Sequence, residues 1–362
     1  MPSPGAGSSR LKAKLQLMDI LVSSMRSHDA YSIHKGMTVC DAHCDTVERI
    51  LKHRIDLGIR SNKGHIDIPR MIEGGVDVQV FACCVHGPGK PAGYYVKLAR
   101  KMIDTLRSQF SRHSNSIELA LKVSDIYKSN KNGKIAAIIG VESGQAIEDD
   151  LNNLQNFYNL GMRIMTLTWK STKWADASQE AMKRNGLTDF GKSVIKEMNR
   201  LKIVIDVSHA ADKTVWDTLK ISRDPIIASH SCAKAICDHP RNLGDDLIKA
   251  IAKAGGVICV NFYSLFLDQK YKLLSAKGLK PKPPPMSGVI DHIEHIVEVG
   301  GIDSVGIGSD FDGMNPPPVG LENVSKMPRI TEELLKRGYL MEEIVKIMGG
   351  NFLRVFGQVC GV

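Results

Sequence analysis

The amino-acid sequence lacks long hydrophobic runs. No apolar stretch approaches the roughly 18 consecutive residues that a membrane-spanning helix requires, which excludes a helical integral membrane protein. A fixed-period repeat is also missing, which excludes solenoid and collagen-like architectures. Core-forming residues are abundant, since 43% of the 362 residues are hydrophobic and 24% are charged. This balance is typical of a folded globular protein and excludes intrinsic disorder for the bulk of the chain.

Closely spaced C-x-x-C pairs are missing, although the chain contains eight cysteines. Their absence excludes a thiolate zinc knuckle. Cys83, Cys84 and Cys259 lie inside the apolar runs VFACCV and GVICVNF, which is typical of buried free thiols. A chain of this length has a core of its own and does not need disulfide cross-links. We therefore expect free thiols.

Targeting signals are missing from both ends. The segment LQLMDILVSSM contains Asp19 and is not followed by a small-residue cleavage site, so it is a poor signal-peptide core. The last residues, VFGQVCGV, offer no hydrophobic tail for a lipid anchor. We expect a cytoplasmic protein without a membrane anchor. Residues 1–36 are predicted to form a partly disordered or helical extension, and residues 37–362 a single catalytic domain with a C-terminal helical segment.

Acidic residues are outnumbered by basic ones, 39 against 48, which gives a net charge of +9. Such a surplus makes nucleic acid the first partner to consider. The basic residues are densest at 96–134 and 270–282, but they show neither aromatic interleaving nor a known nucleic-acid motif. We expect no nucleic-acid partner.

Short runs of β-branched and apolar residues alternate with helical patterns along the chain. Several runs are apolar nearly throughout, as in strands that are covered on both faces. The predicted strands are 37–42, 76–85, 134–141, 162–168, 202–208, 225–229, 256–262 and 304–309. Eight βα units in one series predict a (β/α)8 TIM barrel with elaborated loops. An open doubly wound sheet is disfavoured because no Gly-x-Gly-x-x-Gly follows the first predicted strand.

The segments between these strands carry helix signals. Gly161 is predicted to end a helix that buries Leu154 and Phe157. Thr188 is predicted to cap the next helix, and Asp245 or Asp246 to cap a later one. The basic, proline-rich stretch 267–288 is predicted to be an extended surface loop or a lid over the active-site mouth.

Acidic and imidazole side chains follow the predicted strands at their carboxyl ends. In a barrel these ends meet on one face, where barrel active sites lie. A single histidine or glutamate there is more typical of a hydrogen-bonded structural residue. Five such groups on one rim repel or compete unless a cation lies between them, so together they predict a metal site. The five are His43, Asp45, Glu142, His209 and His230.

Three imidazoles and two carboxylates exceed what one tetrahedral zinc ion uses. Two metal ions bridged by a carboxylate fit the set better, and Glu142 is the natural bridge. His43 and Asp45 are two residues apart in an extended segment, so both can reach one metal. Metal ions lower the pKa of bound water to near neutrality, which predicts a hydrolase.

At this point the sequence resembles the membrane dipeptidase (renal dipeptidase) family of zinc peptidases, within the metal-dependent amidohydrolase barrels. The resemblance runs from about residue 38 to residue 357. It is carried, in order, by the motifs DAHCDT, HIDIPRMIEGGV, GVESG, LGMRIMTLT, WADAS, LTDFGKSVIKEMNRLKIVIDVSH, SHSCAKAICDHPRN, VNFY, GIGSDFDG and NFLRVF. The resemblance implies two Zn²⁺ ions per chain, with other divalent metals as alternatives, and hydrolysis of dipeptides.

The resemblance also implies roles for single residues. His43 and Asp45 match the first-strand metal ligands, Glu142 the bridging glutamate, and His209 and His230 the ligands of the second zinc. Three further residues match the family's catalytic acid, substrate-carboxylate ligand and pocket lining, namely Asp310, Arg241 and Tyr263. Asp310 is implied to act as general base and then general acid.

One departure from the family pattern concerns the fourth predicted strand. Better-known members carry a histidine directly after Leu-Thr, where this chain has Trp169. Indole has one donor and no base, so Trp169 either donates a hydrogen bond to the substrate or shapes the pocket. This departure keeps open hydrolysis of N-acyl amino acids or lactams, and a metal-bearing inactive homologue.

The cysteines depart from the family as well. The disulfide framework of the secreted, lipid-anchored renal members is mostly absent, since Cys237 matches a family cysteine but the partner position reads as Gln269 or nearby. An intracellular member is implied. A homodimer is implied by the resemblance alone.

Overall fold

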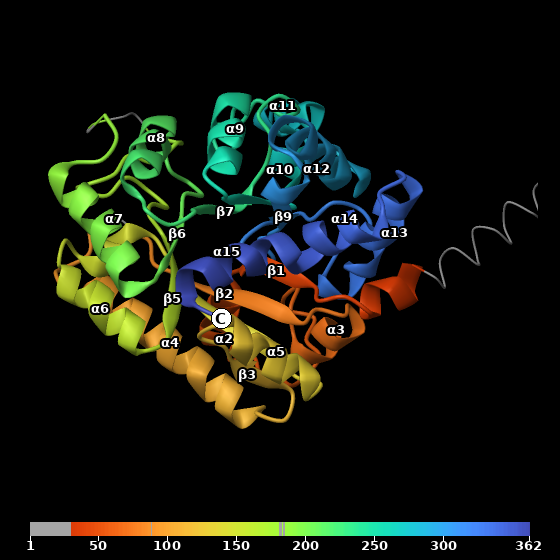
Figure 1. Cartoon of the computed structure of the whole chain (residues 1–362), viewed down its shortest axis with the longest axis horizontal. Coiled ribbons are helices and arrows are strands. Elements are labelled where there is room, and N and C mark those ends of the chain that lie inside the picture. Colours follow the sequence, from red (N-terminus) through yellow and green to blue (C-terminus); the bar gives the residue numbers. More distant parts are fainter. Residues whose placement is uncertain (1–29, 88, 181–182, 184) are drawn as a thin grey trace, which may run out of the picture.

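The computed structural model describes residues 30–87, 89–180, 183 and 185–362. Its single sheet contains nine strands, and every strand pair is parallel. Eight of them follow one another in the order β1-β2-β4-β5-β6-β7-β8-β9, while β3 pairs with β4 outside this path (Figure 1). The strands are β1 (Cys40–Cys44), β2 (Val78–Cys84), β3 (Ile117–Leu119), β4 (Ile135–Glu142), β5 (Met162–Thr166), β6 (Val204–Asp206), β7 (Ile227–Ser231), β8 (Val257–Val260) and β9 (Val305–Ile307).

Hydrogen bonds between β1 and the segment after β9 close the sheet. The backbone N–H of Asp45 donates to the carbonyl of Phe311 at 2.9 Å, and that of Asp310 donates to the carbonyl of His43 at 3.2 Å. Cys44 and Phe311 form a parallel bridge at the same place. The eight strands predicted from the sequence therefore form the predicted (β/α)8 barrel, and β3 is the strand that the sequence analysis missed.

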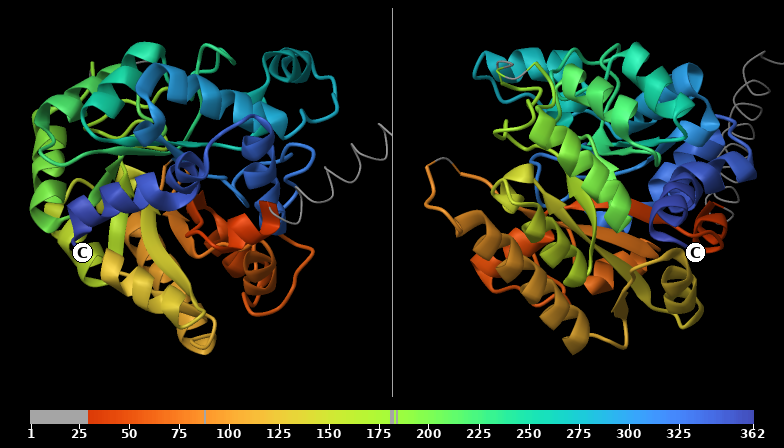
Figure 2. Two further views of the ribbon diagram at one scale, coloured as in Figure 1. Left: turned by 45° about the vertical axis from the view of Figure 1, so that its right-hand side comes forward. Right: turned by 60° about the vertical axis from the view of Figure 1, so that its left-hand side comes forward.

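Helices surround the barrel on its outside (Figure 2). The α-helices are α2 (Thr46–His53), α3 (Ile68–Glu73), α4 (Tyr94–Arg112), α5 (Val123–Lys131), α6 (Leu151–Asn159), α7 (Asp189–Leu201), α8 (Asp212–Ile221), α9 (Asp245–Lys253), α10 (Ser264–Leu267), α11 (Gln269–Ala276), α12 (Ser287–Gly300), α13 (Pro328–Lys336), α14 (Met341–Val345) and α15 (Asn351–Cys360). Shorter helical turns are η1 (Gly144–Ile147), η2 (Ile302–Ser304), η3 (Val324–Lys326) and η4 (Lys346–Gly350).

Two apolar clusters form the core. The larger one lies between the strands and the surrounding helices. The smaller one fills the barrel interior with strand residues such as Ala136 and Ile138 and is closed by Phe352 and Phe356 of α15, which lies across the strands in Figure 1. Interior positions alternate along each strand. On β4 this alternation ends at Glu142, so the apolar filling gives way to polar residues at the carboxyl ends.

The predicted helix ends are confirmed at two places and wrong at one. The Thr188 hydroxyl accepts a hydrogen bond from the backbone of Gly191 and caps α7, and Gly161 follows α6 with φ of 106°. The cap of α9 is Gly244, and Asp245 and Asp246 lie in its first turn. The helix dipole stabilises acidic side chains anywhere in the first turn, whether or not they cap the helix. Taking Asp245 or Asp246 as the cap therefore placed the start of α9 at least one residue too late.

The stretch 267–288 is not an extended loop throughout. Its first half forms α11, which begins where the Asp268 carboxylate accepts a hydrogen bond from the backbone of Tyr271. Only 277–286 connects this helix to α12 in irregular structure. The loop prediction was wrong for the first half because the dense lysines hide a helix whose buried residue is Tyr271.

Part of the predicted N-terminal extension lies outside the described residues, namely 1–29. Residues 30–35 are helical, and the buried His34 ring bonds to the Thr331 hydroxyl and to the Gly74 carbonyl, both at 2.8 Å. The domain boundary at residue 37 stays a prediction. All eight cysteines are free thiols, as predicted, and seven are buried. Every helix in the described part of the chain is too short or too polar to span a bilayer.

Candidate metal centre

The structure brings the predicted metal-site residues together at the carboxyl ends of the barrel strands. His43 belongs to β1, Asp45 is the first residue after that strand, and Glu142 is the last residue of β4. The others lie on β7 or after β6 and β9, namely His230, His209 and Asp310. Their possible ligand atoms include two neighbouring groups, each within 4.8 Å: Glu142 with His209 and His230, and His43 with Asp45 and Asp310. A further group of this kind joins His43 and His230 with Asp206 of β6.

The Glu142 carboxylate lies between the two groups. One of its oxygens, Oε1, is 2.9 Å from Nε2 of His209 and 3.5 Å from Nε2 of His230. The other, Oε2, is 3.5 Å from Nε2 of His43, which is itself 3.5 Å from Oδ2 of Asp45. Each carboxylate oxygen therefore faces its own set of ligands, which is the arrangement that a bridge between two cations needs.

Buried polar atoms near Glu142 lack hydrogen-bond partners among the described residues. They include Nε2 of His43 and Oδ1 of Asp45. Leaving such atoms unpaired is unfavourable unless something else binds them. Gly313 keeps the space open, because a side chain there would collide with the carboxylates of Asp45 and Asp310. The donor set thus fits divalent metal ions.

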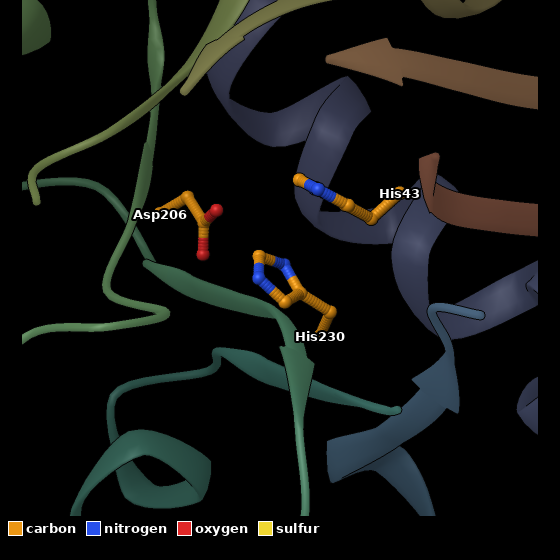
Figure 3. A group of neighbouring side chains, drawn as sticks. All are labelled: His43, Asp206 and His230. Atoms are coloured by element: carbon orange, nitrogen blue, oxygen red, sulfur yellow. The ribbon is translucent and has the colours of Figure 1, made fainter. Parts of the chain in front are cut away.

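A buried hydroxyl orients two of the imidazoles. Ser229 Oγ donates to Asp206 Oδ2 at 2.6 Å and lies 2.8 Å from Nδ1 of His230 and 3.4 Å from Nδ1 of His43. Since the hydroxyl proton goes to Asp206, the oxygen accepts from the ring N–H groups, which leaves both Nε2 atoms free to bind a metal. Figure 3 shows the His230 ring between Asp206 and His43.

Asp206 is held as a supporting group by this network. Its Oδ1 accepts hydrogen bonds from the backbone of Ser208 and Ser229, each at 2.9 Å. Its Oδ2 also accepts from the Thr166 hydroxyl. The carboxylate is fully buried and engaged through both oxygens. We infer that it supports the metal ligands rather than joining them.

Burial and neighbouring charges shift the pKa values of the site. Burial lowers the pKa of His209 to about 4 and that of His230 well below its usual range, so both rings are neutral and able to bind metal. For Glu142, burial is outweighed by His43 and His209, and its pKa lies well below the usual range. Burial raises the pKa of Asp310 to about 6.

Backbone strain accompanies these residues. His209 and Asp310 have φ of 69° and 61°, in the left-handed region that side-chain-bearing residues rarely adopt. Ser143, directly after Glu142, has φ of 89°. Strain of this kind costs about 1–3 kcal/mol per residue and persists where the surroundings fix it, commonly at functional sites.

The site opens into a cavity of about 270 Å³. Its lining includes all four predicted substrate-binding residues, and five lining positions are Asp45, Glu142, His209, Asp310 and Gly313. The remaining positions are Trp169, Gln179, His239, Arg241, Tyr263, Leu265 and Phe266. The Trp169 ring stacks on the ring of His86 with centroids 4.9 Å apart and tilts against His209 at 6.3 Å, so it forms one wall of the cavity.

Arg241 is a buried cation with 3% exposure. Its Nη2 donates to the His230 carbonyl at 3.2 Å, and the guanidinium lies 5.5 Å from the centre of the Phe266 ring. It forms no ion pair with a carboxylate of the described residues, and its Nε has no hydrogen-bond partner there. A buried guanidinium in this state favours an anion in the cavity.

Sequence reasoning missed five lining residues: Gln179, His239, Leu265, Phe266 and Gly313. Each lies within three residues of a motif that was recognised, Gln179 directly after WADAS and His239 within DHPRN. Sequence adjacency was the only available signal, because the loops that carry these side chains are not defined by periodicity. Asn261 was missed too, although it stands in VNFY. Its Nδ2 donates to Asp310 Oδ2 at 2.9 Å.

Comparison with known proteins gives consistent matches. The sequence profile of the membrane dipeptidase family, peptidase family M19, matches residues 27–362. Dipeptidase 3 of Mus musculus is 34% identical over 341 residues, covering 91% of this chain and 66% of that protein. Dipeptidase 3 of Homo sapiens is 34% identical over 342 residues, with 91% and 67% covered. This chain thus spans about two thirds of the length of these relatives.

Among solved structures, a metallo peptidase from Rhodobacter sphaeroides is 26% identical, with a TM-score of 0.81 and coverage of 89% of this chain and 99% of that one. That protein was crystallised with a phosphinate mimic of the dipeptide L-Ala-D-Ala.

Proposed function

The chain belongs to the membrane dipeptidase family of metallopeptidases, peptidase family M19, and on this premise we propose that it is a binuclear zinc dipeptidase. The observation that carries the proposal is that one cavity combines two features. One is the buried Arg241 guanidinium, which forms no ion pair among the described residues, and the other is the Glu142 carboxylate, whose oxygens face two sets of possible ligands. The first offers a place for the carboxylate of a dipeptide and the second a place for two metal ions.

His43, Asp45 and Glu142 would hold one metal ion, since Nε2 of His43 lies 3.5 Å from both carboxylates. Glu142, His209 and His230 would hold the other. Zinc suits this set of imidazole and carboxylate donors, and other divalent metals are alternatives. When bound, two such ions supply a hydroxide-level nucleophile near neutral pH and polarise the scissile carbonyl.

Arg241 would bind the terminal carboxylate of the substrate. Arg241 lines the cavity, and its Nε has no hydrogen-bond partner among the described residues, while Nη2 donates to the carbonyl of His230. The backbone N–H of Arg241 donates to Nδ1 of His239, which steadies this loop. Fixing the carboxylate orients the peptide bond toward Glu142 and Asp310.

Asp310 would move the proton. It lines the cavity, and burial raises its pKa to about 6, which suits a group that takes up and releases a proton near neutral pH. Asn261 holds the carboxylate in place, since its amide donates to Asp310 and its Oδ1 accepts from the backbone of Tyr263 at 2.6 Å. Asp310 thus serves as base toward water and as acid toward the leaving amine.

The test is a metal analysis combined with a dipeptide panel that includes D-residues at the second position. We expect two metal ions per chain, loss of hydrolysis on chelation and recovery on adding Zn²⁺. Glu142→Gln should lose nearly all activity and metal while keeping the fold, as judged by circular dichroism. A fully metallated, active Glu142→Gln protein would contradict the bridging role.

A second candidate function is hydrolysis of N-acyl amino acids or lactams on the same metal ions. Trp169 favours it, because its ring stands against His86 and His209 where the family pattern has a histidine. Including N-acyl amino acids and β-lactams in the panel separates the two functions. An inactive, metal-bearing homologue would retain the metal and hydrolyse none of them.

Three further properties are part of the proposal. We propose a cytoplasmic location, since the eight cysteines are all free. We propose small dipeptides and no nucleic acid as partners. A homodimer is proposed from family membership, and size-exclusion chromatography with light scattering tests it.

A further inference from the structure

A second cluster of ligand-type side chains lies beside the metal centre. It consists of Glu48 in the first turn of α2, Cys84 at the end of β2, and His86 two residues further on. Glu48 Oε1 is 3.1 Å from Nε2 of His86. One possible ligand atom from each of the three residues lies within 4.8 Å of the other two. None of the three was singled out as a ligand by the sequence or by the family pattern.

The fold explains why these side chains converge. Cys84 is the register partner of Glu142 on the neighbouring strand, so its side chain points to the metal-bearing rim. Cys83 points the other way and packs in the outer core cluster. In extended backbone, residues two apart share a direction, which turns His86 toward the side of Cys84. Helix α2 packs on β2, and its first turn brings Glu48 close to Cys84 and His86.

We propose that Glu48, Cys84 and His86 form a third divalent-cation site behind the Trp169 wall of the cavity, with a preference for zinc-like ions. Sulfur, imidazole and carboxylate are the donors that Zn²⁺ and Cd²⁺ bind, and three protein donors leave a fourth position for water. On binding, the Cys84 thiol gives up its proton to solvent and His86 exchanges its contact with Glu48 for the metal.

Cys84 has a second set of neighbours, since its sulfur also lies within 4.8 Å of oxygens of Asp45 and Glu142. It could therefore serve as an added ligand to the first catalytic metal instead. Glu48 and His86 favour the separate site, because they group with Cys84 and with no residue of the catalytic set. The role of His86 distinguishes the two arrangements.

Binding of a cation at this site would affect the proposed dipeptidase activity. Only this effect, and not the site itself, rests on the proposed function. The His86 ring stacks on Trp169, which lines the substrate cavity. A cation bound to His86 fixes that ring and, through the stack, the wall of the cavity. Because the wall of the cavity can then no longer adjust to the substrate, we expect zinc in excess of the catalytic ions to inhibit hydrolysis.

The binding test uses the zinc-loaded protein titrated with Cd²⁺ and followed by the ultraviolet charge-transfer band of a cadmium thiolate. The wild type should take up one more ion than Cys84→Ser, with the band present only in the wild type. Cys83→Ser is the matched control and should behave as the wild type. His86→Gln should weaken this binding about tenfold or more.

Two outcomes would overturn the proposal. One is the absence of a thiolate band in the wild type, or its persistence in Cys84→Ser. The other is unchanged Cd²⁺ affinity in His86→Gln, which would assign Cys84 to the catalytic metal. The inhibitory role is tested separately: Glu48→Gln, which leaves the stack of His86 on Trp169 in place, should keep its activity at stoichiometric zinc and lose most of the inhibition by excess zinc. Equal inhibition of both proteins would remove that role. If the protein hydrolyses no dipeptide, the proposed function is wrong. The number of Cd²⁺ ions bound would still decide whether the third site exists.

Discussion

At the scale of single residues, the Ser229 hydroxyl has the widest influence. It has one proton to give and gives it to Asp206, so the rings of His43 and His230 must direct their N–H groups toward it. The tautomer of two candidate metal ligands therefore depends on one hydrogen bond from Ser229 to the Asp206 carboxylate, to which we assign a supporting role. Such supporting contacts are worth about 10–100-fold in metal affinity.

We expect Ser229→Ala to weaken zinc binding by about 10–100-fold, because both rings become free to adopt the other tautomer. Competition with a chromophoric chelator measures the affinity without reference to activity. Ser231→Ala is the matched control on the same strand, since the Ser231 hydroxyl has no partner among the described residues. Equal zinc affinities for the two variants would contradict the supporting role.

Arg241→Ala should raise KM for dipeptides by about 10–100-fold, since a charge-assisted hydrogen bond to the substrate carboxylate is lost. Dipeptide amides carry no carboxylate, so their kcat/KM should change little. Steady-state kinetics on matched acid and amide substrates measures the difference. Equal losses on both would show that Arg241 supports the loop and not the substrate.

The sequence allowed the candidate metal-site residues to be brought together for a physical reason. Each of them lies at or just after the carboxyl end of a strand, and barrel topology brings these ends together wherever the strands stand in the chain. Ser229 and Gln179 could not be assigned in this way. The role of Ser229 depends on which way a hydroxyl rotates, and that of Gln179 on the path of a loop. Neither property leaves a pattern in the sequence.

At the scale of elements, α12 is tied to the loops beneath it by a neutral histidine. Nδ1 of His292 accepts from the backbone of Ala233 at 3.1 Å, and Nε2 lies 3.2 Å from the carbonyl of Leu267. Protonation would place a proton on the accepting nitrogen and break the first bond. Burial accordingly lowers the pKa of His292 from 6.5 to about 4.

This histidine predicts acid sensitivity. Between about pH 6.5 and 4 the folded protein binds fewer protons at His292 than the unfolded chain does. The contribution of neutral His292 to the free energy of unfolding is therefore fully present above pH 6.5 and is lost as the pH falls toward 4. The loss amounts to about 3 kcal/mol. Urea unfolding of metal-free protein at pH 7 and pH 5 should show a smaller decrease for His292→Gln than for the wild type. Parallel decreases would contradict the assignment.

The elements differ in how far the sequence could predict them. The barrel strands are apolar runs covered on both faces and are visible as such. Strand β3 has three residues, of which only Ile117 is buried, and it exists because it pairs with β4. Helix α11 likewise buries a single residue, Tyr271. Where tertiary pairing rather than an apolar pattern fixes an element, the local sequence is uninformative.

At the scale of the whole molecule, the surplus of positive charge bears on how fast substrates arrive. Nζ of Lys170 lies 5.8 Å from the centre of the ring of Trp169, a residue that lines the cavity, so part of this charge stands close to the cavity. A net charge of +9 attracts anions over distances that salt shortens. Zwitterionic dipeptides have no net charge and feel this field weakly.

We expect kcat/KM for a dipeptide with an acidic side chain to fall several-fold when the ionic strength is raised to about 0.5 M. A neutral zwitterionic dipeptide serves as the control and should change less. Initial rates at low substrate concentration measure both values. An identical response of the two substrates would remove the steering role.

The seam that closes the barrel has a consequence for biosynthesis. The hydrogen bonds that join β1 to the segment after β9 flank His43, Asp45 and Asp310, so the first and last parts of the sheet meet at the metal centre. A nascent chain that has left the ribosome as far as β8 carries five of the candidate ligand residues but has no closed rim to hold them. We therefore expect tight metal binding only after the segment that follows β9 has paired with β1.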